Sequence, residues 1–137
     1  MSTILEIKSS SLGIEVRHTD TKGRGVFATR PFYPGELIER CPVLIVPPDE
    51  WKFVEKSIFY NYLFSWGNAE EDQTALVLGL GSIYNHSYQP LAYYEKDFDN
   101  HLVNFIAHKL IQPGDEITIN YNRDPTCQDP LWFHVLN

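Results

Sequence analysis

Two proline–glycine turns, each followed at once by an apolar strand, constrain the fold of this chain most strongly. Residues 33–36 (Tyr-Pro-Gly-Glu) and 112–115 (Gln-Pro-Gly-Asp) both fit a type II turn. In such a turn proline sets φ at the second position and glycine supplies a positive φ at the third. Turns of this kind reverse the chain between short strands, so they predict a mostly β fold.

Periodicity predicts the remaining elements. Asp49 follows two prolines and is a suitable helix N-cap. Trp51, Val54 and Ile58 then recur at helical spacing, which predicts one helix from Asp49 to about residue 59. We expect a polar loop over 65–74, a hairpin around 97–100, and short strands at 14–17, 26–29, 37–46, 75–78, 92–95, 102–108 and 116–121.

Length and charge limit the functions open to the chain. Its 137 residues have room for one core. The 11 Lys and Arg against 18 Asp and Glu give a formal charge of −7, which argues against direct nucleic-acid binding, because such proteins neutralise phosphates with basic groups. The charge is compatible with a Lys-rich partner, although a solvated acidic surface is the more common reason for it.

The cysteines and the N-terminus bear on metal content and compartment. Cys41 and Cys127 lie far apart and no zinc-type Cys or His spacing occurs, so no metal site is expected. Cys41 lies in an apolar strand and is expected to be a small buried residue. No apolar run reaches membrane length and no secretory pattern opens the chain, so we expect a soluble intracellular protein without membrane contact.

Three short motifs place glycines or polar side chains beside apolar strands. Residues 22–25 (Lys-Gly-Arg-Gly) form a turn where backbone can approach a ligand closely, although a plain hairpin turn explains the glycines equally well in isolation. Residues 85–87 (Asn-His-Ser) put an amide and an imidazole side by side, with Pro90 shortly after. The third motif runs from Pro113 through an alternating strand to the phenol of Tyr121.

In this order and at these separations, the three motifs resemble those of the SET-domain lysine methyltransferases. The resemblance extends from about Gly13 to Tyr121, and the chain looks most like the minimal stand-alone SET proteins of bacteria and viruses, including the small chlorella-virus histone methyltransferases. It implies a β-clip (SET-domain) fold with a pseudoknot-like crossing near the C-terminus. It also implies a leader at 1–12, the SET domain at 13–122, and a C-terminal segment at 123–137 that closes the site.

The chain departs from the family pattern in two places. Tyr88 and Leu91 stand where the family often has a small thiol and a loop-fixing amide, which affects the loop after the second motif. The cysteine-rich flanks that bind zinc in many relatives are absent. In the minimal members C-terminal aromatic residues close the site instead, and Trp132 is the candidate for that role here.

The resemblance implies S-adenosylmethionine as the cofactor and methyl transfer to a lysine amine as the reaction. Glycine turns suit the amino-acid end of the cofactor, and an amide beside a backbone segment suits its adenine edge. The expected cofactor-binding residues are Lys22, Gly23, Arg24, Gly25, Asn85, His86, Tyr121 and Trp132.

Tyr121 is the expected catalytic residue. A free lysine has a pKa of ~10.4, so about 0.04% of it is neutral at pH 7. A sulfonium roughly 5 Å away, at an effective dielectric of ~20, lowers that pKa by roughly two units. A phenol with a pKa of ~10 is a poor base at pH 7, so we expect Tyr121 to orient the amine while the proton leaves to water.

Two further residues are expected to line the channel for the target lysine, together with Tyr121. Tyr62 belongs to a segment that resembles the Tyr-Leu-Phe-Ser of small family members, although it could be an ordinary core aromatic. Ile119 lies two positions before Tyr121 on a strand and should share its face, which would permit di- or trimethylation. Its alternative role is core filler. Tyr84 and Tyr94 receive no role, because single aromatics are weak evidence in a chain with 14% aromatic residues.

The expected partner is a Lys-rich protein or peptide, such as a histone. The rival interpretation is a non-catalytic SET-like module that binds a basic peptide, and the altered 88–91 loop favours it. The viral relatives imply a homodimer, with the cytoplasm or a host nucleus as the compartment. The sequence leaves the substrate, the product state and the oligomeric state open.

Overall fold

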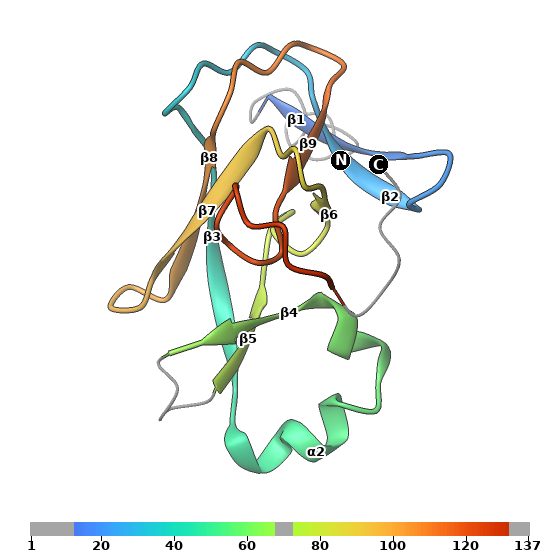
Figure 1. The fold of residues 1–137 in the computed structure, drawn as a ribbon. Coiled ribbons are helices and arrows are strands. Elements are labelled where there is room, and N and C mark those ends of the chain that lie inside the picture. The colour runs from blue at the N-terminus through green and yellow to red at the C-terminus, as the bar shows by residue number, and fades with distance from the viewer. Residues whose placement is uncertain (1–12, 68–72, 132–137) are drawn as a thin grey trace, which may run out of the picture.

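The computed structural model describes residues 13–67 and 73–131, and within them the chain is mostly β (Figure 1). One sheet has the order β1-β2-β9-β6, and a second has the order β4-β5-β3-β8-β7. The first comprises β1 (Ile14–His18), β2 (Arg24–Ala28), β9 (Glu116–Ile119) and β6 (Asn85–His86). The second comprises β4 (Leu63–Trp66), β5 (Gln73–Val77), β3 (Leu37–Val46), β8 (Leu102–Ala107) and β7 (Ala92–Asp97).

One apolar core joins the two sheets. Val26 and Ile117 of the first sheet and Val103 and Phe105 of the second are fully buried in the same cluster. Burial of each such side chain stabilises the fold by about 1.5–3 kcal/mol. The shared core therefore fixes the position of one sheet relative to the other.

Both proline–glycine turns are confirmed. The Glu36 N–H donates to the Tyr33 carbonyl over 2.9 Å, and the Asp115 N–H donates to the Gln112 carbonyl over 3.0 Å. Gly35 and Gly114 have φ values of +88° and +91°, which a side chain would strain. Each turn leads into the strand that was expected to follow it, β3 and β9.

The predicted helix from Asp49 to residue 59 is wrong in its extent. Its α-helical part, α2, covers Trp51–Val54, between the 3-10 helices η1 (Pro48–Glu50) and η2 (Ile58–Tyr62), and Asp49 caps neither helix. The Ser57 hydroxyl explains the break. It donates to the Val54 carbonyl over 2.7 Å and accepts from the Phe59 N–H over 3.2 Å, so it replaces helical backbone bonds with local ones.

The polar loop predicted over 65–74 is also too long. Ser65 and Trp66 belong to β4, and β5 begins at Gln73, with Trp66 opposite Gln73 in the antiparallel pair. Trp66 is 3% exposed and packs edge-on against Phe98 at 4.9 Å between ring centroids, so burial of its ring favours strand over loop.

The five-stranded sheet curls so that its two end strands, β4 and β7, meet. The Lys96 ammonium on β7 donates to the Ser65 carbonyl on β4 over 2.6 Å. The rings of Phe64 and Tyr94 lie edge to face, with centroids 5.2 Å apart. Although β4 and β7 are not neighbours in the sheet, the curl therefore brings their side chains to face each other.

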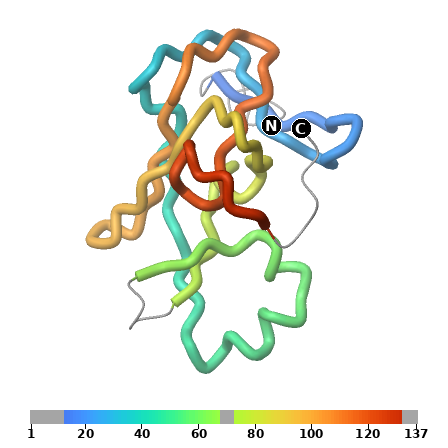
Figure 2. Tube along the Cα trace, in the orientation of Figure 1, coloured from blue at the N-terminus to red at the C-terminus, as the bar shows by residue number. Residues whose placement is uncertain are grey.

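A crossing of chain segments forms near the C-terminus, as expected for the fold. β6 pairs in parallel with β9, so that Asn85 lies opposite Thr118 and His86 opposite Ile119. Residues 120–131 then fold back over the loop that follows β6 (Figure 2). The Tyr88 hydroxyl donates to the Asp129 carbonyl over 3.0 Å and holds this segment in place.

Candidate active site

Two cavities open beside the crossing, and they share part of their walls. The larger has a volume of about 550 Å³ and is lined by His18, Lys22, Gly23, Arg24, Asn61, Tyr62, Ser82, Ile83, Asn85 and Tyr121. The smaller, of about 210 Å³, is lined by Asn61, Tyr62, Leu63, Phe64, Ser65, Gly81, Ser82, Tyr84, Tyr94, Lys96 and Tyr121. The shared residues are Asn61, Tyr62, Ser82 and Tyr121.

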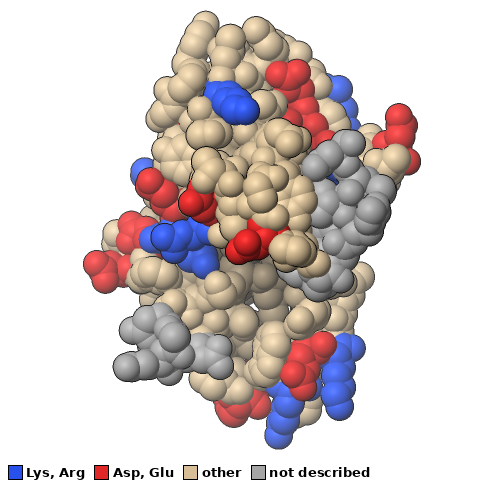
Figure 3. Space-filling view, viewed as in Figure 1, with Lys and Arg blue, Asp and Glu red and all other residues tan. Residues whose placement is uncertain are grey.

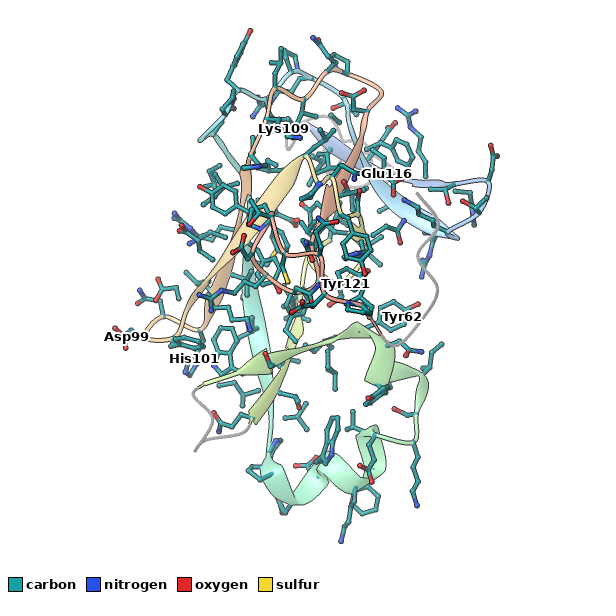
Figure 4. The ribbon with its side chains drawn as sticks, in the orientation of Figure 1. Tyr62, Asp99, His101, Lys109, Glu116 and Tyr121 are labelled. Atoms are coloured by element: carbon teal, nitrogen blue, oxygen red, sulfur yellow. The ribbon has the colours of Figure 1, made fainter. Side chains whose placement is uncertain are left out.

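Tyr121 and Tyr62 lie next to each other where the cavities meet (Figure 4). Asp99 and His101 lie far from them at the tip of the β7–β8 hairpin, and Lys109 lies toward the other end of the molecule. The structure thus brings two of the three residues expected in the lysine channel together. Each of the two faces both cavities.

Hydrogen bonds fix both the hydroxyl and the backbone of Tyr121. Its hydroxyl donates to the Tyr84 carbonyl over 2.7 Å, and its backbone N–H donates to Nδ1 of His86 over 3.0 Å. Burial, and then the nearby Tyr62, Glu116 and Tyr94, raise its pKa to about 12. The phenol is therefore uncharged at pH 7 and is unsuited to act as a base.

Tyr84 is fixed in turn by a buried carboxylate. Its hydroxyl donates to Oε1 of Glu39 over 2.9 Å, and Oε2 accepts from the Leu80 N–H over 2.9 Å. The ring stacks on Phe105 with centroids 4.4 Å apart. Glu39 thereby holds the turn before β6, and the carbonyl that receives the Tyr121 hydroxyl is fixed with it.

His86 lies beneath Tyr121 and, within the described residues, is absent from the lining of both cavities. The residue is 4% exposed, and its ring packs edge-on against Tyr88 at 4.5 Å and Tyr121 at 5.2 Å. Burial, with a smaller effect of Lys22, lowers its pKa to about 4, so the imidazole is neutral at pH 7. Because Nδ1 accepts the Tyr121 N–H, the ring hydrogen is on Nε2.

Asn85 is anchored by Glu116, a residue that the sequence analysis did not single out. The amide nitrogen donates to Oε2 of Glu116 over 2.8 Å and to the Arg24 carbonyl over 3.0 Å. Both of its hydrogens are thus used within the protein, so a contact with a ligand in the larger cavity would use the carbonyl oxygen. No local sequence pattern could have identified Glu116 as the partner of Asn85, because 31 residues separate the two.

The glycines of the first motif serve different purposes. Gly23 lines the larger cavity and has a φ of +71°, and its carbonyl accepts from the Thr19 N–H over 2.6 Å. Gly25 is buried outside the lining. A Cβ on Gly25 would lie 2.9 Å from the Asn85 amide and closer still to the Glu116 carboxylate. Gly25 therefore makes room for the pair that anchors Asn85.

Two cations of the first motif face the larger cavity. Lys22 and Arg24 both line it, and the Lys22 ammonium is 4.0 Å from Oε1 of Glu116. The Lys22 N–H also donates to the Thr19 hydroxyl over 2.7 Å, which fixes the start of the turn. This end of the cavity can receive a carboxylate.

Ile119 lies elsewhere than expected. It is fully buried in the core cluster and is absent from both cavity linings, as far as the structure describes the chain. The expectation assumed that strand alternation continues to Tyr121, but β9 ends at Ile119. Both sides of this strand end are buried, so alternation does not select a cavity face. The proposed role of Trp132 falls outside the described residues.

The smaller cavity contains several residues to which the sequence analysis gave no role. Tyr84, Tyr94 and Lys96 line it together with Phe64. Tyr94 and Lys96 lie two apart on β7 and so share a face, which is a signal the sequence did contain. That this face meets β4 depends on the curl of the sheet.

In the described part of the chain, no group of three or more His, Cys, Asp or Glu side chains is arranged to hold a metal ion. Among residues 13–67 and 73–131, no helix is long and apolar enough to span a bilayer. Cys41 is buried, as expected, and burial raises the pKa of its thiol.

The chain is similar to known proteins over most of its length. The SET domain family model matches residues 23–122. A Schizosaccharomyces pombe (strain 972 / ATCC 24843) protein named histone-lysine N-methyltransferase, H3 lysine-37 specific, is 34% identical over 121 residues, which is 88% of this chain and 76% of the relative. A solved structure of a candidate histone methyltransferase from Plasmodium falciparum superposes with a TM-score of 0.62 at 30% identity, covering 80% of this chain and 92% of that one.

Proposed function

This chain belongs to the SET domain family and is a protein-lysine methyltransferase, and we propose that it transfers methyl groups from S-adenosylmethionine to a lysine of a basic protein such as a histone. The observation that carries the proposal is the meeting of two cavities at Tyr121 and Tyr62. A methyl donor and a lysine amine must approach from different sides and touch at one point. Two cavities that share one tyrosine pair fit that need.

The larger cavity fits the cofactor in size and in chemistry. About 550 Å³ is within the usual range of small-molecule sites. Lys22 offers an ammonium to the carboxylate of the amino-acid end, and the Asn85 carbonyl oxygen can accept from the adenine amino group. When bound, S-adenosylmethionine supplies an activated methyl group and a positively charged sulfonium.

The smaller cavity fits a lysine side chain. Phe64, Tyr84 and Tyr94 supply aromatic walls for its four methylene groups, and Tyr62 and Tyr121 stand where its amine would arrive. Because the Tyr121 hydroxyl hydrogen is directed to the Tyr84 carbonyl, the phenol oxygen can accept an N–H of the amine. That hydrogen bond would orient the amine lone pair toward the larger cavity, and the proton would leave to water.

A histone is the best-supported substrate class. The S. pombe relative is named for lysine 37 of histone H3, and a net charge of −7 favours a basic partner. On the face in Figure 3, uncharged residues predominate and the charged ones stand in small groups of mixed sign. Contacts at the cavities, rather than one charged patch on this face, would then select the lysine.

Calorimetry followed by methyl transfer tests the proposal against a non-catalytic peptide-binding module. We expect the protein to bind S-adenosylmethionine and to transfer labelled methyl groups to recombinant histone H3, with mass spectrometry locating the modified lysine. A matched H3 with arginine in place of that lysine should receive no label. Peptide binding without cofactor binding or methyl transfer would favour the rival module.

A further inference from the structure

The wall of the smaller cavity has an unusual charge for a site that receives a lysine. Among the lining residues that the structure describes, Lys96 is charged, the others are uncharged, and no Asp or Glu occurs. A site built to bind an ammonium group would ordinarily supply a carboxylate. A cation on the wall instead disfavours a second positive charge in the same space.

Lys96 is held in place by β4, the strand on the far side of the cavity. Its ammonium donates to the Ser65 carbonyl over 2.6 Å and to the Ser65 hydroxyl over 3.0 Å. The side chain is half-buried, and its position on β7 two residues after Tyr94 puts both on the cavity face. Its charge therefore lies at a fixed place in the wall.

Among the described residues that line the smaller cavity, no acidic group compensates this charge. Arg123 adds a second cation, which together with the larger effect of burial lowers the pKa of Lys96 to about 8. The phenols of Tyr121, Tyr94 and Tyr84 have raised pKa values and are neutral.

The acids nearest in sequence line a second hollow, outside the smaller cavity, which Lys96 also lines. Its acidic residues are Glu95, Asp97 and Asp99, and Asp97 bonds to Asn100. In the part of the chain that the structure describes, Lys96 forms no ion pair within 4.0 Å. At pH 7 the cavity wall thus carries a positive charge.

We propose that Lys96 makes the smaller cavity selective for the uncharged form of the target lysine, so that it promotes loss of the amine proton to water before methyl transfer. The inference rests on the proposed function, because it takes the smaller cavity as the lysine channel. It extends that function by naming a residue that acts on the charge of the substrate. At separations within one cavity of this size, a neighbouring cation lowers an amine pKa by about one unit or more.

Three variants separate charge from structure. Lys96→Met keeps an unbranched side chain of similar length and removes the charge. Lys96→Arg keeps the charge. Ser65→Ala removes one hydrogen-bond partner of Lys96 and leaves its charge. Lys96 does not line the larger cavity, so all three should bind S-adenosylmethionine within a few-fold of wild type and should unfold cooperatively.

The first readout is peptide binding at pH 7 with S-adenosylhomocysteine, which lacks the sulfonium charge. An H3 peptide spanning lysine 37 is compared with the same peptide carrying norleucine there, which has the methylene chain without the amine. Wild type should favour norleucine. Lys96→Met should shift the ratio of the two dissociation constants toward the lysine peptide by roughly tenfold. Lys96→Arg and Ser65→Ala should leave the ratio near wild type.

The second readout is the pH profile of kcat at saturating histone H3 and S-adenosylmethionine, since kcat reports pKa values in the complex. Lys96→Met should move the acid limb upward by about one pH unit. An unchanged ratio and an unchanged limb in active Lys96→Met would overturn the inference alone, as would equal shifts in Lys96→Arg. Wild type that neither binds the peptides nor methylates histone H3 would contradict the proposed function, and the inference with it.

Discussion

The Tyr121 hydroxyl donates to the backbone carbonyl of Tyr84 over 2.7 Å and thereby ties the end of the third motif to the residue before the second. Tyr84 and Tyr121 are 37 residues apart in the sequence, and the parallel pairing of β6 with β9 brings them together. Because Tyr84 is itself held by Glu39, the phenol oxygen of Tyr121 has a defined position where the cavities meet.

Asn85→Ala should weaken S-adenosylmethionine binding by roughly tenfold to a hundredfold. The substitution removes the one polar atom of Asn85 that its intraprotein bonds leave for the cofactor, the carbonyl oxygen, and that loss costs about 1–3 kcal/mol of binding free energy. It also leaves the Glu116 carboxylate without its amide donor, which lowers the stability of the free protein as well. Asn122→Ala is the control, because its amide bonds to the Asp129 carbonyl outside both cavities. An unchanged dissociation constant in folded Asn85→Ala would remove Asn85 from the cofactor site.

Gly25→Ala and Gly23→Ala should destabilise the cofactor-free protein by different routes. A methyl at Gly25 displaces the Asn85–Glu116 pair, whereas one at Gly23 meets no atom within 4 Å and costs about 1–2 kcal/mol through its positive φ. Denaturant unfolding of double variants with Asn85→Ala tests this. The loss of unfolding free energy in Gly25→Ala/Asn85→Ala should be smaller than the sum of the two single losses. In Gly23→Ala/Asn85→Ala it should equal that sum. Additivity in both pairs would contradict the account of Gly25.

The free energy of unfolding should fall as the pH drops from about 6.5 to about 4, in part because of His86. Its pKa is about 4 in the folded protein and near 6.5 when unfolded, so the unfolded chain binds the extra proton in this window. The contribution of neutral His86 to the free energy of unfolding is fully present above pH 6.5. Below that pH it is lost at up to ~1.4 kcal/mol per pH unit. His86→Asn keeps an acceptor for the Tyr121 N–H and should flatten this slope. Parallel wild-type and variant profiles would count against a neutral buried imidazole.

Local turn and motif chemistry could be predicted from the sequence. The two Pro-Gly turns need a positive φ at one position, and the glycine in each turn identifies that position directly. The first motif reached the larger cavity through Lys22, Gly23 and Arg24 because its turn is local. The residues Asn85, Tyr62 and Tyr121 followed from the family resemblance, and the structure brings them to the same place.

Features that depend on tertiary contacts could not be predicted in this way. Lys96 and Tyr94 reach the smaller cavity because the sheet curls until β7 meets β4, and no local pattern encodes that meeting. Ile119 was assigned to the channel by alternation, but the strand ends there and core packing takes the side chain. The α-helix ends at Val54 because the Ser57 hydroxyl competes for its backbone hydrogen bonds. A single serine is a weaker sequence signal than the apolar periodicity that predicted a longer helix.

Tyr121→Phe tests the central claim, that methyl transfer takes place where the two cavities meet, most directly. Labelled methyl transfer to histone H3 and calorimetric binding of S-adenosylmethionine are measured on the same preparations of wild type, Tyr121→Phe and Tyr93→Phe. Tyr93→Phe is the matched control, because Tyr93 lies on β7 and lines neither cavity. We expect Tyr121→Phe to lower kcat by ~100-fold or more while its cofactor affinity stays within a few-fold of wild type, and Tyr93→Phe to stay within a few-fold in both. Wild-type turnover in Tyr121→Phe would contradict the account.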